Sequence, residues 1–92
     1  MQIFSPFLNL PSRALKDYYA LIKHPMSLAA VQKRIRGVVG RNPPNGVSLY
    51  SSWDALEEDA QWIWINAKEY NEDGSDIHNL AVELEVRWPR NI

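Results

Sequence analysis

The stretch Asn66-Ala67-Lys68-Glu69-Tyr70-Asn71-Glu72-Asp73-Gly74-Ser75-Asp76-Ile77 decides how the rest of this 92-residue chain is interpreted. It begins as a helix with an apolar period, passes through a short polar loop and restarts as a helix at Asp76. Asn71 lies at the break, where a side-chain amide can point into a cavity. Upstream, Asp17-Tyr18-Tyr19-Ala20-Leu21-Ile22-Lys23-His24-Pro25-Met26 supplies two tyrosines and a Pro-Met step. An amide that faces a tyrosine-rich loop suits a small neutral polar group on an apolar stem.

Length and composition indicate one small domain. A chain of this size buries roughly 60–70% of its unfolded surface. The absence of cysteine excludes disulfides, thiolate metal sites and a cysteine nucleophile. No apolar run approaches the roughly 20 residues that span a membrane, and no signal peptide is visible. The sequence therefore predicts a soluble intracellular protein.

Charge is distributed unevenly along the chain. Residues 1–46 carry a net charge of +6, with Asp17 as their one acid, whereas residues 47–92 carry −7. One explanation is that opposite charges face one another across a bundle. The other is an acidic rim around the Asn71 loop that attracts a basic peptide, formed by Glu69, Glu72, Asp73 and Asp76.

The first half of the chain is expected to be a long ordered loop followed by one helix. Prolines at positions 6, 11 and 25 interrupt longer helical runs within residues 1–26, leaving room for one helical turn around residues 14–21. Ser27 is a good N-cap and Gly37 a typical helix stop. The helix between them has an apolar face of Leu28, Val31 and Ile35.

Two helices are expected in the second half, after a turn-rich connector at residues 38–51. The helix from Ser52 to Tyr70 has a single stripe of Trp53, Leu56, Ala60, Ile63, Trp64, Ala67 and Asn71. Trp62 lies half a turn away, and packing within the chain is favoured over a partner-binding surface. The last helix has Ser75 or Asp76 as its cap, ends at Pro89 and buries Ile77, Leu80, Ala81, Leu84 and Trp88.

The residues of an enzyme active site are missing. His24 and His78 are the only imidazoles, and neither belongs to a catalytic triad motif or to a metal-ligand spacing. Structural or solvent-exposed roles are expected for both. No glycine-rich phosphate loop is present. The sequence therefore predicts a protein that is not an enzyme and has no cofactor or metal.

One basic edge is a candidate for nucleic-acid contact. Its four cations could touch phosphates with a salt-dependent, sequence-independent affinity. No aromatic side chain is interleaved among them to stack on a base, so a solvated edge is favoured. The residues are Lys33, Arg34, Arg36 and Arg41.

Several separated motifs, in the correct order, resemble those of a bromodomain over about residues 4–86. Among bromodomains the chain most resembles those of fungal chromatin-remodelling subunits of the polybromo or RSC type. The motifs are Phe7-Leu8-Asn9-Leu10-Pro11-Ser12, Asp17-Tyr18-Tyr19, Ile22-Lys23-His24-Pro25-Met26-Ser27-Leu28, Asn66-Ala67, Tyr70-Asn71 and Gly74-Ser75.

The resemblance implies an all-α fold, a left-handed bundle of helices Z, A, B and C. The ZA loop would be residues 1–26, helix A 27–37, the AB loop 38–51, helix B 52–70, the BC loop 71–75 and helix C 76–88. Helix Z is expected to be absent, because Met1 falls where the ZA loop should begin. Its absence would expose apolar surface, with Trp62 a candidate for part of it, and favour self-association.

The resemblance also implies that the chain reads acetyl-lysine. Asn71 would donate to the acetyl carbonyl, and Tyr18 would reach the same oxygen through a water. The expected walls of the pocket are Phe7, Leu10, Leu15, Met26, Tyr70 and Ile77. The implied partners are acetylated histone tails and other subunits of a chromatin-remodelling complex in the nucleus. Two alternatives stay open: an interaction scaffold with weak or no acetyl-lysine binding, and contact of the basic edge with the DNA backbone.

Overall fold

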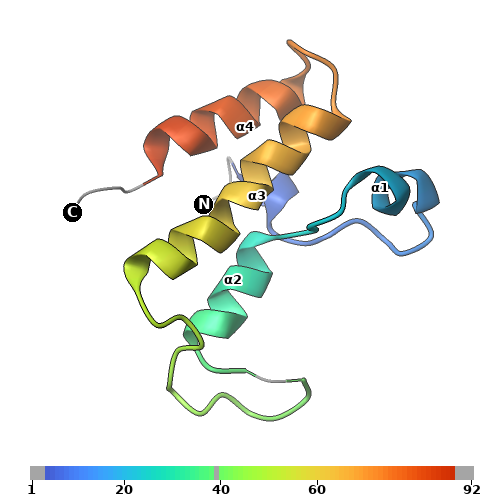
Figure 1. Ribbon diagram of the computed structural model, residues 1–92. Coiled ribbons are helices and arrows are strands. Elements are labelled where there is room, and N and C mark those ends of the chain that lie inside the picture. The colour runs from blue at the N-terminus through green and yellow to red at the C-terminus, as the bar shows by residue number, and fades with distance from the viewer. Residues whose placement is uncertain (1–3, 39, 89–92) are drawn as a thin grey trace.

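The computed structural model describes residues 4–38 and 40–88, and every regular element within them is helical. The expected all-α fold class is confirmed (Figure 1). None of the helices in these residues is both long and apolar enough to cross a membrane. The elements are the 3-10 helix η1 (Ser5–Phe7) and the α-helices α1 (Lys16–Leu21), α2 (Leu28–Ile35), α3 (Trp53–Tyr70) and α4 (Asp76–Arg87).

The three longer helices begin at serine N-caps. The hydroxyl groups of Ser27, Ser52 and Ser75 accept hydrogen bonds from the backbone N–H three residues further on, at 3.1, 3.1 and 3.3 Å. Such a cap satisfies one of the N–H groups that the first helical turn leaves unpaired. Gly37 adopts φ +76° just after α2, as expected of a residue that stops a helix. The helix ends therefore follow directly from local sequence.

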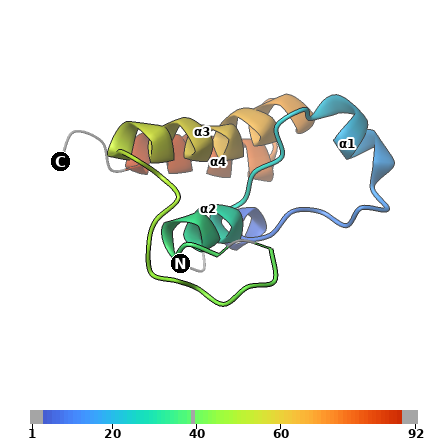
Figure 2. The ribbon, with the colours of Figure 1, turned by 60° about the horizontal axis from the view of Figure 1, so that its bottom comes forward.

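Helix α3 is the central element, because it contacts both α4 and α2 (Figures 1 and 2). Trp64 of α3 is 2% exposed, and its ring lies 5.6 Å from that of Trp88, at the end of α4. The buried core joins this helix to its neighbours and to the N-terminal segment. Its members are Phe4, Phe7, Val31, Leu56, Ala60, Ile63, Trp64, Ala67, Ala81 and Leu84.

The expected apolar faces are wrong at two helix ends. Trp53 and Ile35 belong to the expected apolar stripes, yet they are 49% and 43% exposed. Trp53 is the first residue of α3 and Ile35 the last residue of α2, so both exposed positions lie at a helix end. Helix α4 ends at Arg87, with Trp88 already extended, and Pro89 lies outside the described residues.

Opposite charges pair across the bundle. Arg34 of α2 forms an ion pair with Asp59 of α3, which also accepts a hydrogen bond from the Tyr50 hydroxyl at 2.9 Å. Lys68 and Glu85 join α3 to α4 at 2.6 Å. The Arg34–Asp59 pair links the basic half of the chain to the acidic half, so it supports the first explanation of the charge asymmetry.

Candidate functional site

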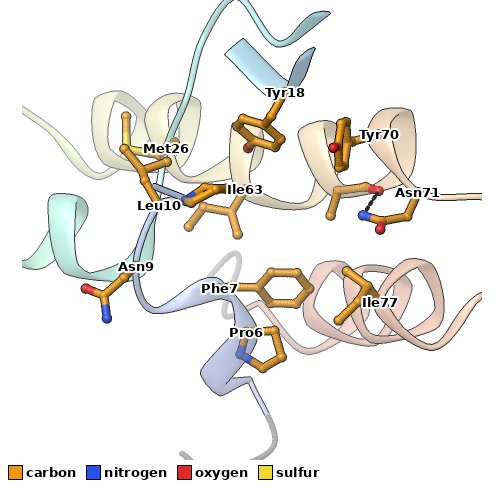
Figure 3. A pocket seen from close by; sticks show the side chains of 12 residues that line it. Pro6, Phe7, Asn9, Leu10, Tyr18, Met26, Ile63, Tyr70, Asn71 and Ile77 are labelled. Atoms are coloured by element: carbon orange, nitrogen blue, oxygen red, sulfur yellow. Dashed lines mark hydrogen bonds between the residues drawn. The ribbon is translucent and has the colours of Figure 1, made fainter. Parts of the chain in front are cut away.

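A cavity of about 210 Å³ opens between the N-terminal loop, the end of α3 and the start of α4 (Figure 3). The volume greatly exceeds the roughly 10–15 Å³ that a cavity needs to hold one water molecule, so a side-chain stem can enter together with water. Its lining residues are Pro6, Phe7, Asn9, Leu10, Pro11, Tyr18, Met26, Ile63, Ala67, Tyr70, Asn71 and Ile77.

Asn71 lies at the C-terminus of α3, where the backbone turns extended with φ −102° and ψ 149°. Its backbone N–H donates to the Ala67 carbonyl at 3.1 Å, and its side-chain Nδ2 donates to the same oxygen at 2.9 Å (Figure 3). An asparagine amide has two N–H donors, so one is still available after this bond. The helix end therefore fixes the amide and leaves it one donor for a ligand.

Tyr18 enters the cavity from α1 and lies against Tyr70 of α3. The two rings meet edge to face, with centroids 4.9 Å apart, and Tyr19 lies 5.1 Å from Tyr18 on another side. Burial raises the pKa of Tyr18 above its ordinary value, and the neighbouring Tyr19 and Tyr70 raise it further. The Tyr18 hydroxyl consequently remains protonated at neutral pH and can donate a hydrogen bond within the cavity.

The loop that carries Pro6 to Pro11 is held in place by two hydrogen bonds from the rest of the chain. The Tyr19 hydroxyl donates to the Pro11 carbonyl at 2.6 Å, and Ala29 N–H donates to the Leu8 carbonyl at 3.0 Å. Further along, the buried side chain of Asn66 donates to the His24 carbonyl at 2.7 Å. Because these bonds satisfy buried or loop polar groups, they keep the wall of the cavity ordered.

Trp62 packs on the segment that contains His24. Its ring stacks on the His24 ring, with centroids 4.5 Å apart and an interplanar angle of 24°. The favoured expectation, that Trp62 packs within the chain, is confirmed. His24 thereby has a structural contact on the loop that returns to α2.

Comparison with known protein families gives a clear result. The family model described as "Bromodomain" matches residues 1–83. The chain belongs to the bromodomain family. Its identified relatives are larger proteins, and this bromodomain spans only 6–13% of the length of the three described next.

Two of these relatives are chromatin-remodelling subunits of Schizosaccharomyces pombe. Chromatin structure-remodeling complex subunit snf21 is 35% identical over 87 residues, which are 94% of this chain and 6% of that protein. Subunit rsc4 is 33% identical over 79 residues, 85% of this chain and 13% of its own. Transcription factor GTE4 of Arabidopsis thaliana is 31% identical over 90 residues, which cover 94% of this chain and 10% of that protein. The expected resemblance to fungal remodelling subunits is confirmed.

Seven of the eight residues expected at the site of this bromodomain line the cavity. Leu15 does not, and its expected position in the wall is wrong. Its N–H bonds to the Ser12 carbonyl at 2.9 Å in a tight turn, which places Leu15 at the start of α1 with 38% of its surface exposed. The chain therefore leaves the pocket before Leu15 and returns to it with Tyr18.

Sequence reasoning missed five lining residues. Ile63 and Ala67 are expected only as members of the helical stripe, although they lie eight and four residues before Asn71 on the same face of α3. That spacing was a usable signal that the stripe ends as a pocket floor. The other three belong to the N-terminal loop, where no period guides assignment: Pro6, Asn9 and Pro11.

Acidic side chains lie beside Asn71 but do not line the cavity. Glu69, Glu72, Asp73 and Asp76 are all exposed, and Asp73 Oδ1 lies 3.3 Å from His78 Nε2. Within the part of the chain that the structure describes, no group of three or more His, Cys, Asp or Glu could hold a metal ion. The cavity itself is apolar apart from amide and hydroxyl groups, whereas its surroundings on the α3–α4 side carry negative charge.

Proposed function

We propose that this bromodomain reads acetylated lysine, with the Asn71 amide donating to the acetyl carbonyl. The observation that carries the proposal is the free donor of Asn71 beside the Tyr18 hydroxyl in an otherwise apolar cavity of about 210 Å³. Tyr18 reaches the same carbonyl through a bridging water. Phe7, Leu10 and Ile77 surround the methyl group and the stem.

Rejection of charge accounts for most of the selectivity in this proposal. Acetylation converts an ammonium group into a neutral amide, which can enter an apolar pocket. An unmodified lysine would lose its hydration at a cost of several kcal/mol, and no carboxylate lines the cavity to compensate. One amide hydrogen bond, a bridging water and a small apolar area suggest a Kd in the micromolar range or weaker.

The proposed partners are acetylated histone tails, and the proposed setting is a chromatin-associated complex in the nucleus. Relatives named as chromatin-remodelling subunits and as a transcription factor support this setting. The exposed acidic residues beside Asn71 suit the basic flanks of such tails. The role is binding rather than catalysis. Self-association, expected from the sequence, has no support in the described residues and is not part of the proposal.

The test is a titration with one histone peptide in acetylated and unmodified forms, followed by amide chemical shifts. We expect the acetylated peptide alone to shift residues around the cavity. Asn71→Ala should lower its affinity about tenfold to a hundredfold, because loss of one buried hydrogen-bond partner costs about 1–3 kcal/mol. The control is Asn42→Ala, which removes an exposed amide from the loop between α2 and α3.

Two outcomes would contradict the proposal. Equal binding of the acetylated and unmodified peptides would show that the cavity does not discriminate against charge. Undiminished binding by Asn71→Ala, in a variant whose spectrum shows a retained fold, would remove Asn71 as the anchor.

A further inference from the structure

A second surface lies at the other end of α3, where the loop after α2 returns to the bundle. Four large apolar side chains are exposed there: Ile35, Val47, Leu49 and Trp53, at 43%, 68%, 51% and 49%. We call these residues, together with Lys33 and Arg36, the loop-end surface. None of the six lines the cavity. Exposed apolar residues that lie near one another in a fold mark an interaction site more often than isolated ones do.

Backbone contacts bring the residues of the loop-end surface together. Leu49 N–H donates to the Arg34 carbonyl at 2.8 Å, and Gly46 N–H donates to the Arg36 carbonyl at 3.1 Å. Residues 46–49 therefore run along the C-terminal end of α2. Trp53 follows four residues after Leu49 as the first residue of α3.

The loop after α2 approaches the end of that helix closely, and this close approach fixes the position of the loop. Gly37 has φ +76°, and a Cβ at this position would collide with the Val47 carbonyl oxygen and the Asn45 side chain. Asn45 Oδ1 also accepts a hydrogen bond from Val47 N–H at 2.8 Å. The loop-end surface is consequently preformed, which lowers the entropy that a partner must remove on binding.

The two charged residues of this surface, Lys33 and Arg36, are both basic. No Asp or Glu occurs between Asp17 and Asp54, an interval that contains five Lys or Arg. Arg34 is already paired with Asp59, but Lys33 and Arg36 are exposed, three residues apart and therefore on neighbouring positions of the helix surface. The nearest acid in sequence, Asp54, lies in the first turn of α3, where it favours the helix N-terminus.

The loop-end surface is well separated from the candidate acetyl-lysine site. Trp53 and Asn71 lie at opposite ends of α3, about 27 Å apart at 1.5 Å per helical residue. The connecting loops leave the two ends of this helix in different directions (Figures 1 and 2). A ligand at one end therefore does not obstruct the other.

We propose that the loop-end surface docks an acidic amphipathic segment of a partner protein. Its apolar side chains would pack on Val47, Leu49 and Trp53, and its carboxylates would face Lys33 and Arg36. A nucleic-acid backbone also matches the cations, but it would leave four exposed apolar side chains without a contact. The combination of both kinds of residue favours a peptide.

The test uses the whole 92-residue chain and three probes. The first is a synthetic peptide of about 16 residues whose Leu and Phe lie on one face of a helix and whose Glu or Asp lie on the other. The second has Lys in place of every acid, and the third is a short DNA duplex. We expect the acidic peptide alone to shift amides of residues 33–37 and 45–53, leaving those around Asn71 unchanged.

Paired variants test the apolar and the basic residues of the loop-end surface separately. Leu49→Ser should weaken binding of the acidic peptide at least fivefold, whereas Val86→Ser, an exposed apolar residue of α4, should not. Arg36→Glu should weaken it similarly, and Lys16→Glu, which makes the same change of charge on α1, should have less effect. Chemical shifts of each variant show whether its fold is retained.

The results discriminate clearly. Binding of the acidic peptide that is lost in both Leu49→Ser and Arg36→Glu supports the proposal. Shifts from the DNA duplex alone, equal binding of the acidic and basic peptides, or no binding of any probe at millimolar concentration would overturn it.

Discussion

Asn71 shows how one residue can both end a helix and equip a pocket. Its Nδ2 donates to the Ala67 carbonyl, which also accepts the backbone N–H of Asn71, so the side-chain amide is tied to the last turn of α3. The same bond orients the amide toward the cavity before a ligand arrives. An asparagine at this position therefore supplies a preoriented donor, which a flexible glutamine would have to order on binding.

Tyr18→Phe should weaken acetyl-lysine binding less than Asn71→Ala does, by about twofold to tenfold. The phenylalanine ring keeps the edge-to-face contact with Tyr70, and only a water-mediated hydrogen bond is lost. Calorimetric titration of both variants with one acetylated peptide provides the comparison. An effect of Tyr18→Phe that equals that of Asn71→Ala would show that the hydroxyl contacts the ligand directly.

The raised pKa of Tyr18 predicts how binding depends on pH. Burial favours the neutral phenol, so the folded-state pKa lies above the ordinary value of about 10. The stabilisation that this provides is present below pH 10 and is lost as pH rises through the folded-state pKa. For a peptide without titrating groups, Tyr18 should therefore contribute no change in affinity between about pH 6 and 9. Fluorescence titrations across this range would detect a departure.

At the scale of elements, the end of α2 depends on a glycine for two separate reasons. Gly37→Ala adds both backbone strain at φ +76° and a collision with Val47 and Asn45. Gly46→Ala is a matched control, because Gly46 has φ +79° with no atom within 4 Å of a new Cβ. We expect the control to lose about 1–2 kcal/mol of unfolding free energy and Gly37→Ala a further 1–3 kcal/mol. Urea denaturation measures both, and equal losses would contradict the close approach.

Helix α3 offers a second matched pair. Trp64→Ala should destabilise the fold by about 3–5 kcal/mol, because it leaves a cavity in the core and removes the contact with Trp88. Trp53→Ala, on the same helix but half exposed, should change stability by about 0.5 kcal/mol. Thermal denaturation followed by circular dichroism compares the two. Similar melting temperatures would mean that the buried face of α3 has been assigned wrongly.

Across the whole molecule, local signals were easier to predict than burial. The serine caps, Gly37 and the break at Asn71 depend on a few neighbouring residues, so the sequence alone located α2, α3 and α4 to within two residues at each end. The periodic stripes identified the correct faces. They could not show that Trp53 and Ile35, which lie at helix ends, are exposed, since this depends on where the neighbouring helices end.

The pocket wall was harder to predict, because the N-terminal loop has no period to follow. Phe4 enters the core and stacks on Phe7, with ring centroids 6.5 Å apart, yet nothing in the local sequence distinguishes it from Leu15, which lies exposed. Their difference arises from hydrogen bonds that join this loop to distant residues, such as Ala29 to Leu8. The family resemblance supplied most of the wall, and the tertiary contacts decided the remainder.

Because the two surfaces are separate, an acetylated peptide should stabilise the domain through its contacts at the Asn71 end of α3 alone. An acetylated peptide at ten times its Kd should raise the unfolding free energy by about 1.4 kcal/mol, which corresponds to about 5–10 °C in Tm for a domain of this size. Asn71→Ala should lose this shift, whereas Leu49→Ser at the other end of α3 should keep it, whatever its own Tm. Differential scanning fluorimetry with acetylated and unmodified peptides measures the shifts. Loss of the shift in Leu49→Ser as well would show that the two ends are energetically coupled through α3.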